Sequence, residues 1–497
     1  MGNPIQQGSG LGSLGYIKYG IEKHWGATIT YIGGATATIV AGATTLTAIN
    51  VNGILPGMYV YFLDGLLPGS NVEYPNLLES PIAVASVAGS VITLASPTTQ
   101  SHYGPVSASL PTSGSLIQVA YQPSKGLYFE SETLTSSLNY WSPGFIAASR
   151  VGTQQLLKGA EKVSGNIVMH IGPDWANDLL TGTFGFEQET FGTNPTGTGV
   201  LAASAAANSL TFNSTTTYTV GQTVQLDSTP NRECRVITVA ATPVYTFTSP
   251  LRFAHASGAA VKVVVGPYTH QVVLANVLPS FTMEKFDAGD ASFSGAAGAS
   301  FATSFAYTGM YINKSQIKVD NKQGPKLTVS FEGQGETLIP ATTPPSYPGT
   351  DAFVFSNVFL SLDGGTTQIT NFGDVEVSVD NKLVMDTFLN NTTKVGIIKP
   401  GLRKIDGKYA IYFSDYNTYA DYRDSNSKSF LMRFTQPATG YSITLSLTKV
   451  IYTKYDVKQP AGGLVMADVS FEAKLDTSTG SEGTIVIVDG NPLNYGF

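Results

Sequence analysis

The sequence predicts a mainly β fold with few short helices. Apolar and polar residues alternate with period two in long runs, such as 158–171 and 442–457, whereas helical periodicity is scarce. The composition agrees, because 25 Tyr, 52 Gly and 26 Pro favour strands joined by turns. Hydrophobic residues make up 42% of the 497 residues, which is enough for several cores. We therefore expect an all-β protein of more than one domain.

Charged residues account for only 13% of the chain, which suggests that partner subunits cover much of its surface. The net charge is -7 and no basic stretch occurs, which argues against tight binding of nucleic acid through counterion release. An acidic wall along which DNA slides remains compatible with this charge. Cys234 is the single cysteine, so we expect neither an intrachain disulfide nor a cysteine-rich metal site. Neither a signal peptide nor a membrane span is predicted, and we expect synthesis in a cytoplasm.

Two strand patterns recur along the chain. KLTVSFEGQ (326–334) returns as MADVSFEAK (466–474) at an offset of 140 residues. LKGAEKVSGNIVMHIG (157–172) aligns with KPGLRKIDGKYAIYFS (399–414) at an offset of 242. A short helix is predicted after each of the latter strands, over 173–180 and 415–424. Pro suits the first turn of the former, and Ser414 or Asp415 would cap the latter. The common order indicates a duplicated unit.

Extra residues separate the two patterns in the first half of the chain. TVGQTVQLD (219–227) resembles LPGMYVYFLD (55–64), so two small related β modules are expected. A Gly/Ala/Ser-rich loop follows over 287–303, and 337–351 is a Pro-containing linker. The expected layout is an N-terminal arm (1–26), a β module (27–117), a first domain (118–198 plus 266–340), a second module (199–265), a linker (341–352) and a second domain (353–497).

The sequence contains no catalytic pattern, so we expect a protein that is not an enzyme and uses no cofactor or metal. Its five histidines are scattered, and neither metal-ligand spacing nor a GxSxG turn occurs. Gly10, Gly12 and Gly15 fit GxGxxG, but no strand precedes them. His102 and His255 hold equivalent places in the two modules, which suggests a shared structural contact rather than a ligand site.

The order of several segments resembles a known family. These segments are GYIKYGIEKHWGA (15–27), LYFESETLTSSLNYWSPG (127–144), GPYTHQVVLANVLPSFTMEKF (266–286) and FVFSNVFLSLDG (353–364). Together they resemble the major tail tube proteins of long-tailed, siphovirus-type bacteriophages, in the duplicated form with two tube domains per chain. The resemblance implies β-sandwiches with a flanking helix, whose sheets join across subunits into a barrel around a channel. Three chains would then form a pseudo-hexameric ring, and stacked rings would conduct DNA from capsid to host cell.

The resemblance also suggests functional residues. Glu332 and Glu472 are candidates for the channel wall, and the alternative is that they are ordinary solvent-facing carboxylates. Ring-to-ring contacts are expected from the arm (2–19), the loop 139–155 and its counterpart 380–399, unless these segments fold back onto their own domain. The candidate stacking residues are Met385, Phe388, Ile397, Ile398, Tyr140 and Trp141.

The expected location is the virion, and the expected partners are other copies of the chain, the tape measure, terminator and distal tail proteins, and DNA that passes without specific binding. The two modules would project outwards, where host surface glycans are further candidate partners. An alternative function is a carbohydrate-binding or adhesive β protein, for which Tyr59, Tyr61, Tyr74 and Tyr103 would supply aromatic contacts. A β-rich hydrolase, a terminator and a surface-layer protein are the remaining alternatives.

Overall fold

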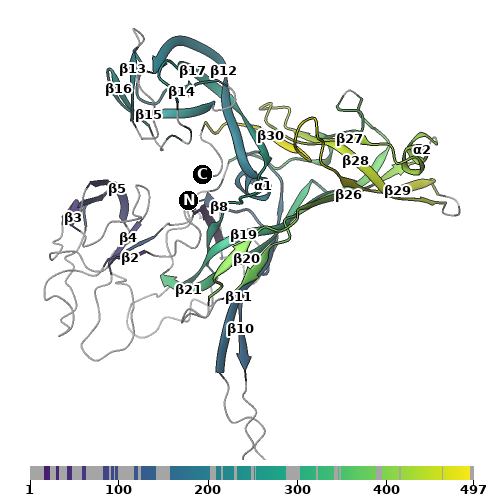
Figure 1. The fold of residues 1–497 in the computed structure, drawn as a ribbon, viewed down its shortest axis with the longest axis horizontal. Helices are drawn as coiled ribbons and strands as arrows, with labels where there is room; N and C mark the ends of the chain where they lie inside the picture. Colours follow the sequence, from purple (N-terminus) through teal and green to yellow (C-terminus); the bar gives the residue numbers. More distant parts are fainter. Residues whose placement is uncertain are drawn as a thin grey trace, which may run out of the picture.

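The computed structural model is mostly β, which confirms the predicted fold class. Strands that are distant in the sequence pair into one extended hydrogen-bonded system, and a separate sheet of six strands lies beside it (Figure 1). The structure describes residues 16–22, 30–32, 42–47, 59–62, 82–88, 91–94, 96–98, 117–120, 125–141, 157–201, 209–213, 217–228, 232–247, 251, 253, 255–286, 303–320, 323–340, 345, 347, 349–365, 367–387, 394–413, 416–459, 461 and 463–492.

Eight antiparallel strands form what we call the long sheet, which runs through the centre of the molecule (Figure 1). Strict alternation produces it: along 326–333 the residues Leu327, Val329 and Phe331 are buried, and the polar residues between them are half-buried. Its order is β10 (Thr135–Trp141), β11 (Leu157–His170), β20 (Lys326–Gly333), β19 (Thr303–Val319), β23 (Phe372–Asp380), β26 (Lys404–Tyr412), β29 (Met466–Ala473) and β28 (Ser442–Lys458).

Two shorter sheets cover the apolar face of the long sheet. One pairs β1 (Tyr16–Ile21), β18 (Phe281–Phe286), β19 and β21 (Gly335–Pro340). The other pairs β22 (Val358–Ser361), β27 (Lys428–Thr435), β28 and β30 (Thr484–Asp489). Aromatic side chains fill the space between the layers: Phe281 meets Phe331 edge to face, and Phe430 lies 4.7 Å from Phe471 between ring centroids.

The strands divide into two units with the same pairing register. The first unit comprises β1, β10, β11, α1 (Asn177–Phe184) and β18–β21, and the second comprises β22, β23, β26, α2 (Asn417–Arg423) and β27–β30. Ser164 lies opposite Glu332 in the first unit, and Asp406 lies opposite Glu472 in the second. A bulge follows Ile312 in β19 and recurs 140 residues later in β28. The sequence offsets of 242 and 140 are therefore also offsets between strand pairings.

A long two-stranded ribbon belongs to the first unit alone within the described part of the chain. It consists of β12 (Gly185–Leu201) and β17 (Ala260–Leu274), and β17 also pairs with β30 of the second unit. Its far end carries β13 (Ser209–Asn213), β14 (Thr223–Leu226), β15 (Glu233–Ala241) and β16 (Val244–Phe247) (Figure 1). There His255 is buried and contacts Asp227 and Glu233. Whether His102 makes the same contact stays a prediction, because His102 lies outside the described residues.

The remaining elements are short. The six-stranded sheet has the order β2 (Thr30–Ile32), β7 (Ile117–Ala120), β4 (Tyr59–Phe62), β5 (Ile82–Ala88), β6 (Val91–Leu94) and β3 (Thr45–Thr47). A hairpin of β24 (Val384–Asp386) and β25 (Ile397–Lys399) extends from the second unit. The others are β8 (Lys125–Gly126), β9 (Ser131–Glu132) and the 3-10 turn η2 (Phe355–Asn357).

Several local predictions need correction. The first helix begins at Asn177 rather than 173, because Asp174 adopts a positive φ of 66° that no helix accommodates. Tyr416, without a side-chain hydrogen bond, precedes α2, and the expected caps Ser414 and Asp415 lie outside the described residues. Residues 337–340 of the expected linker are strand, since they pair with β19. The expected loop over 287–302 lies outside the described residues, and the domain boundaries remain a prediction.

Membrane insertion through a helix finds no support here. Neither of the two helices in the described residues has the length and apolar character that crossing a bilayer requires.

Candidate functional site

The face of the long sheet that points away from the core is polar along all eight strands. Directly opposed residues lie on one face of an antiparallel sheet, so the strand pairings define this polar face. Lysines and carboxylates are interspersed over it. They are Lys162, Lys314, Lys318, Lys326, Lys404, Lys408, Lys454 and Lys458 with Glu332, Glu376, Asp380, Asp406, Asp456, Asp468 and Glu472.

Ion pairs link neighbouring strands across the polar face. Lys162 Nζ lies 3.3 Å from Glu332 Oε2, and Lys408 Nζ lies 3.0 Å from Glu376 Oε2. Glu472 Oε1 lies 2.5 Å from Lys474 Nζ. Both predicted wall carboxylates, Glu332 and Glu472, thus lie at matching positions on this face, each beside a lysine. The polar face therefore carries mixed charge.

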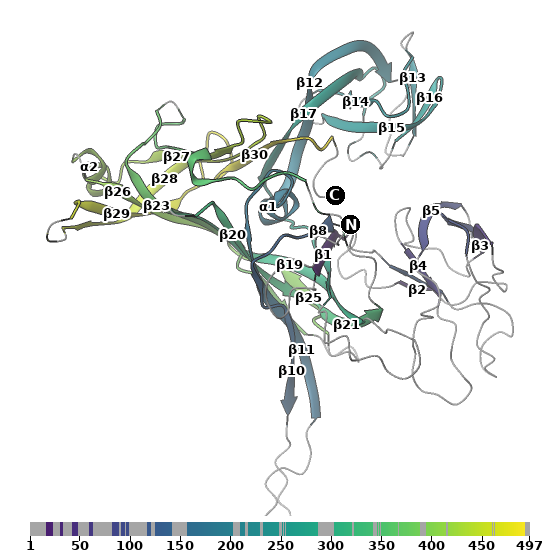
Figure 2. The same ribbon diagram turned by 180° about the vertical axis from the view of Figure 1, so that it is seen from behind.

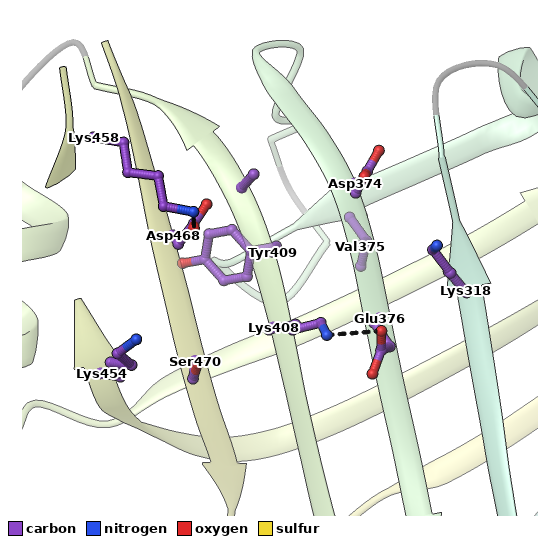
Figure 3. A pocket seen from close by; sticks show the side chains of 11 residues that line it. Lys318, Asp374, Val375, Glu376, Lys408, Tyr409, Lys454, Lys458, Asp468 and Ser470 are labelled. Carbon is purple, nitrogen blue, oxygen red and sulfur yellow. Dashed lines mark ion pairs between the residues drawn. The ribbon is translucent and has the colours of Figure 1, made fainter. Parts of the chain in front are cut away.

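A hollow lies on the polar face where the two units meet (Figure 3). Lys318 of β19 faces Glu376 of β23 there, and Lys408 of β26 forms its ion pair with the same carboxylate (Figure 3). Lys458 of β28 pairs with Asp468 of β29 at the other end of the hollow. The hollow therefore crosses the junction between the units on a continuous charged surface.

The sequence reasoning missed these lysines, although a signal for them was present. Lys314 and Lys318 recur as Lys454 and Lys458 at the same offset of 140 that relates the strands. Period-two lysines at matched offsets on two β-strands predict one charged face.

The candidate stacking residues fall on two hairpins with matching register. Tyr140 on β10 is 53% exposed, and the side chain of Trp141, paired with Leu157, lies outside the described set. In the second hairpin Val384 pairs with Lys399, and this pair is equivalent to Trp141 and Leu157 of the first hairpin. The other three described candidates are less exposed than Tyr140: Met385 and Ile397 are half-buried, and Ile398 is 5% exposed. Phe388 lies outside the described residues.

Three exposed apolar residues were not among the candidates: Val277 and Leu402 lie on loops, and Val384 begins β24. Leu402 is 92% exposed, Val277 72% and Val384 63%. The Arg403 guanidinium donates to the Ala275 carbonyl at 3.1 Å, which places the first two near each other at the boundary of the units. No periodicity marks them, because each lies in or beside a turn. They add to the exposed apolar surface of the described residues.

A strongly perturbed titratable group, His270, is buried beneath α1 rather than on the polar face. His270 contacts Glu187 through Nδ1 (2.8 Å) and Asp489 through Nε2 (3.2 Å), and all three side chains are fully buried. Burial opposes the charged imidazole, but Glu187 and Asp489 together raise the pKa of His270 to about 10. Asn177 of α1 also donates to Asp489 at 2.7 Å. This network joins the ribbon, the helix and β30, which is a structural role.

The described residues contain no group of three or more His, Cys, Asp or Glu side chains arranged to hold a metal ion. The structure gives no side-chain position for the aromatic residues expected to contact glycans. The side chains of Tyr59 and Tyr61, and all of Tyr74 and Tyr103, lie outside the described set.

The comparison with protein families gives one match. The family described as "Phage tail tube protein" matches residues 89–473, which is most of the chain and includes both β11 and β29. The search of curated proteins gave no match.

Proposed function

The chain belongs to the phage tail tube protein family, and from this premise we propose that it is the tube subunit of a siphovirus-type tail with two tube units in one chain. As a member of that family it is a structural protein of the virion. Its duplicated organisation is our inference from the paired registers of the two units.

The single observation that carries the proposal is the long sheet, in which two four-strand units follow each other in one register. Such a sheet has two unpaired edges, which closure into a barrel removes. Three chains of eight strands would supply 24 strands and six units, which fits a pseudo-hexameric ring. The polar face would then line the channel.

The mixed charge of the polar face suits a channel for DNA. A basic wall would bind phosphates by releasing counterions, which would slow passage. Here each lysine beside a carboxylate, as in Lys162–Glu332 and Lys408–Glu376, offers DNA no net positive charge. Glu332 and Glu472 are accordingly proposed to keep the wall from holding DNA, in agreement with their position on this face.

Stacked rings would make the tube. The two matching hairpins, with Tyr140 in the first and Met385 and Ile397 in the second, together with Leu402 and Val277, are proposed ring-to-ring contacts. The family membership implies assembly with itself and with other tail proteins. The tape measure, terminator and distal tail proteins are the partners that we propose.

Electron microscopy of the purified chain at rising concentration tests this function. We expect hollow filaments whose rings contain three chains, which image classification along the filament axis would count. A chain that stays monomeric even when crowded would contradict the proposal.

The channel wall can be tested separately. The double variant Glu332→Lys/Glu472→Lys removes the carboxylate partners of Lys162 and Lys474 and adds two further lysines. It is expected to retain DNA in assembled tubes at low salt, with release as salt rises. Asp351→Lys, on the exposed linker, is the matched control and should retain none. Equal retention by both would show that the polar face does not line the channel.

A further inference from the structure

We propose that β28 of one chain pairs with β10 of a second copy of the chain, antiparallel and in the register that joins β19 to β23 within the chain. The inference rests on the proposed tube function and adds to it the partner segment and the residue register. The register is taken from the junction between the two units within one chain, where β19 pairs with β23.

The internal junction is a regular antiparallel pairing. Lys314 lies opposite Asp380, and Gln316 lies opposite Ser378. Gln316 donates from Nε2 to Glu376 Oε1 at 2.5 Å across the same pairing. At this junction β23, the first strand of the second unit in the sheet order, pairs with β19, the last strand of the first unit, and so continues the sheet.

The two ends of the long sheet carry the counterparts of these strands. Strand β10 pairs only with β11 among the described strands, and the portion of β28 after its bulge pairs only with β29. Residues 453, 454 and 456–458 of that portion are exposed. The edge strand β28 is the counterpart of β19, and the edge strand β10 is the counterpart of β23. Two copies of the chain therefore present complementary edges to each other.

The unit offsets give the register between copies. The shift of 140 residues carries Gln316 to Asp456, as it carries β20 to β29. Ser378 corresponds to Thr135, because each lies opposite the equivalent residue of the next strand, Asp406 or Ser164. The internal pair Gln316–Ser378 therefore predicts an intermolecular pair of Asp456 with Thr135.

A cluster of tyrosines beside the free edge supports a second copy as the occupant. Tyr419 and Tyr422 of α2 lie 5.5 and 6.1 Å from Tyr455 of β28 between ring centroids, and Tyr416 is 72% exposed. The equivalent helix α1 of the first unit is buried along its whole length at the junction. A second copy seated on β28 would cover these rings as the chain covers α1.

Paired cysteines test the register in the assembled full-length chain. Asp456→Cys/Thr135→Cys is expected to form a disulfide between chains, on the order of tenfold faster than Asp456→Cys/Ser137→Cys, which lies two residues out of register on the same face. Gln316→Cys/Ser378→Cys is the positive control and should close within one chain. Cys234 is fully buried and leaves the background clean.

The readout is a non-reducing gel of rings or filaments after mild oxidation. Linked chains up to a closed trimer from the in-register pair alone support the inference. Rings that form normally but cross-link through the out-of-register pair, or through neither pair while the internal control closes, overturn the register and leave the tube function intact. Absence of any assembly by the unmodified chain overturns the tube function, and the inference with it.

Discussion

Helices α1 and α2 follow equivalent strands of the two units, yet every residue of α1 is buried and none of α2 is. The rest of the chain makes the difference. The ribbon β12–β17 and strand β30 contact α1, and Tyr19 and Lys125 both donate to Asp178 of α1 at 2.8 and 2.5 Å. In the described part of the chain, α2 packs mainly on β28, at the end of the molecule away from the β10–β11 hairpin (Figure 2).

The comparison shows that one strand framework tolerates two different coverings. Helix α1 of the first unit is covered inside the chain, whereas the second unit presents tyrosines beside a strand edge that pairs on one side only among the described residues. A β edge and an apolar surface left together on one side of a molecule favour association. The asymmetry between the helices therefore agrees with a chain that is one part of a closed ring.

The largest expected effect comes from the matching glycines of β11 and β26. A Cβ on Gly165 would lie 2.5 Å from both Leu134 Cα and Thr133 O, whereas a Cβ on Gly407 would meet the Phe471 ring and, at 2.8 Å, the Glu376 carbonyl oxygen. Because the backbone contacts are closer at Gly165, Gly165→Ala should lower the free energy of unfolding by about 3 kcal/mol and Gly407→Ala by about 1–2 kcal/mol. Denaturant titration measures both. Gly349→Ala, with open space around it, is the control, and an equal loss there would remove the argument.

The charged network under α1 should make the first unit sensitive to high pH. The folded pKa of His270 is about 10, against an ordinary value of 6.5. Its stabilisation is therefore complete below pH 6.5 and is lost as the pH rises through 10. A shift from 6.5 to about 10 corresponds to a loss on the order of 5 kcal/mol over that range.

Hydrogen exchange of the α1 amides should report this loss between pH 7 and 10, with α2 as the internal control because the described residues place no buried histidine–carboxylate network beneath it. His270→Gln should abolish the pH dependence. An unchanged pH slope in that variant would assign the effect to another group.

Asn381 lies where the two units meet and differs from its counterpart in the first unit. Its side-chain amide donates to the carbonyls of Thr183 (3.2 Å) and Ile312 (3.0 Å), and it is 1% exposed. The equivalent residue of the first unit is Leu138. Asn381→Leu leaves two buried carbonyls without this donor and should cost about 1–2 kcal/mol in unfolding free energy. Asn371→Leu removes a longer bond at an exposed site and should cost less than about 0.5 kcal/mol.

Much of this framework was readable from the sequence, because period-two patterns and repeat offsets report local strand geometry. KLTVSFEGQ and MADVSFEAK predicted strands that the structure places in equivalent pairings. The start of α1 was misplaced, since the positive φ of Asp174 has no signal in composition. The pairing of β17 with β30 and the contact of Glu187 with His270 join distant segments, and no periodicity encodes such partners.

The smallest effect is expected where the two units carry different residues at one place on the polar face. Glu376 and Lys408 are opposed in the second unit, and Thr133 and Asn166 hold the corresponding places in the first. There Thr133 Oγ1 accepts from the backbone N–H of Asn166 at 2.9 Å. Glu376→Thr alone leaves Lys408 unpaired and removes the acceptor of Gln316. We expect it to cost about 1 kcal/mol, less at high salt.

The double variant Glu376→Thr/Lys408→Asn transfers the first unit's pair into the second and should change the unfolding free energy by less than about 0.5 kcal/mol, with no salt dependence. Denaturant titrations at low and high salt compare it with the single variant. Since the lysine side chain is 64% exposed, its charge contributes little to folding, and the pair is expected to matter for the surface rather than for the fold. A double variant that is as unstable as the single one would show instead that the second unit depends on this ion pair, so that the polar faces of the two units are not interchangeable.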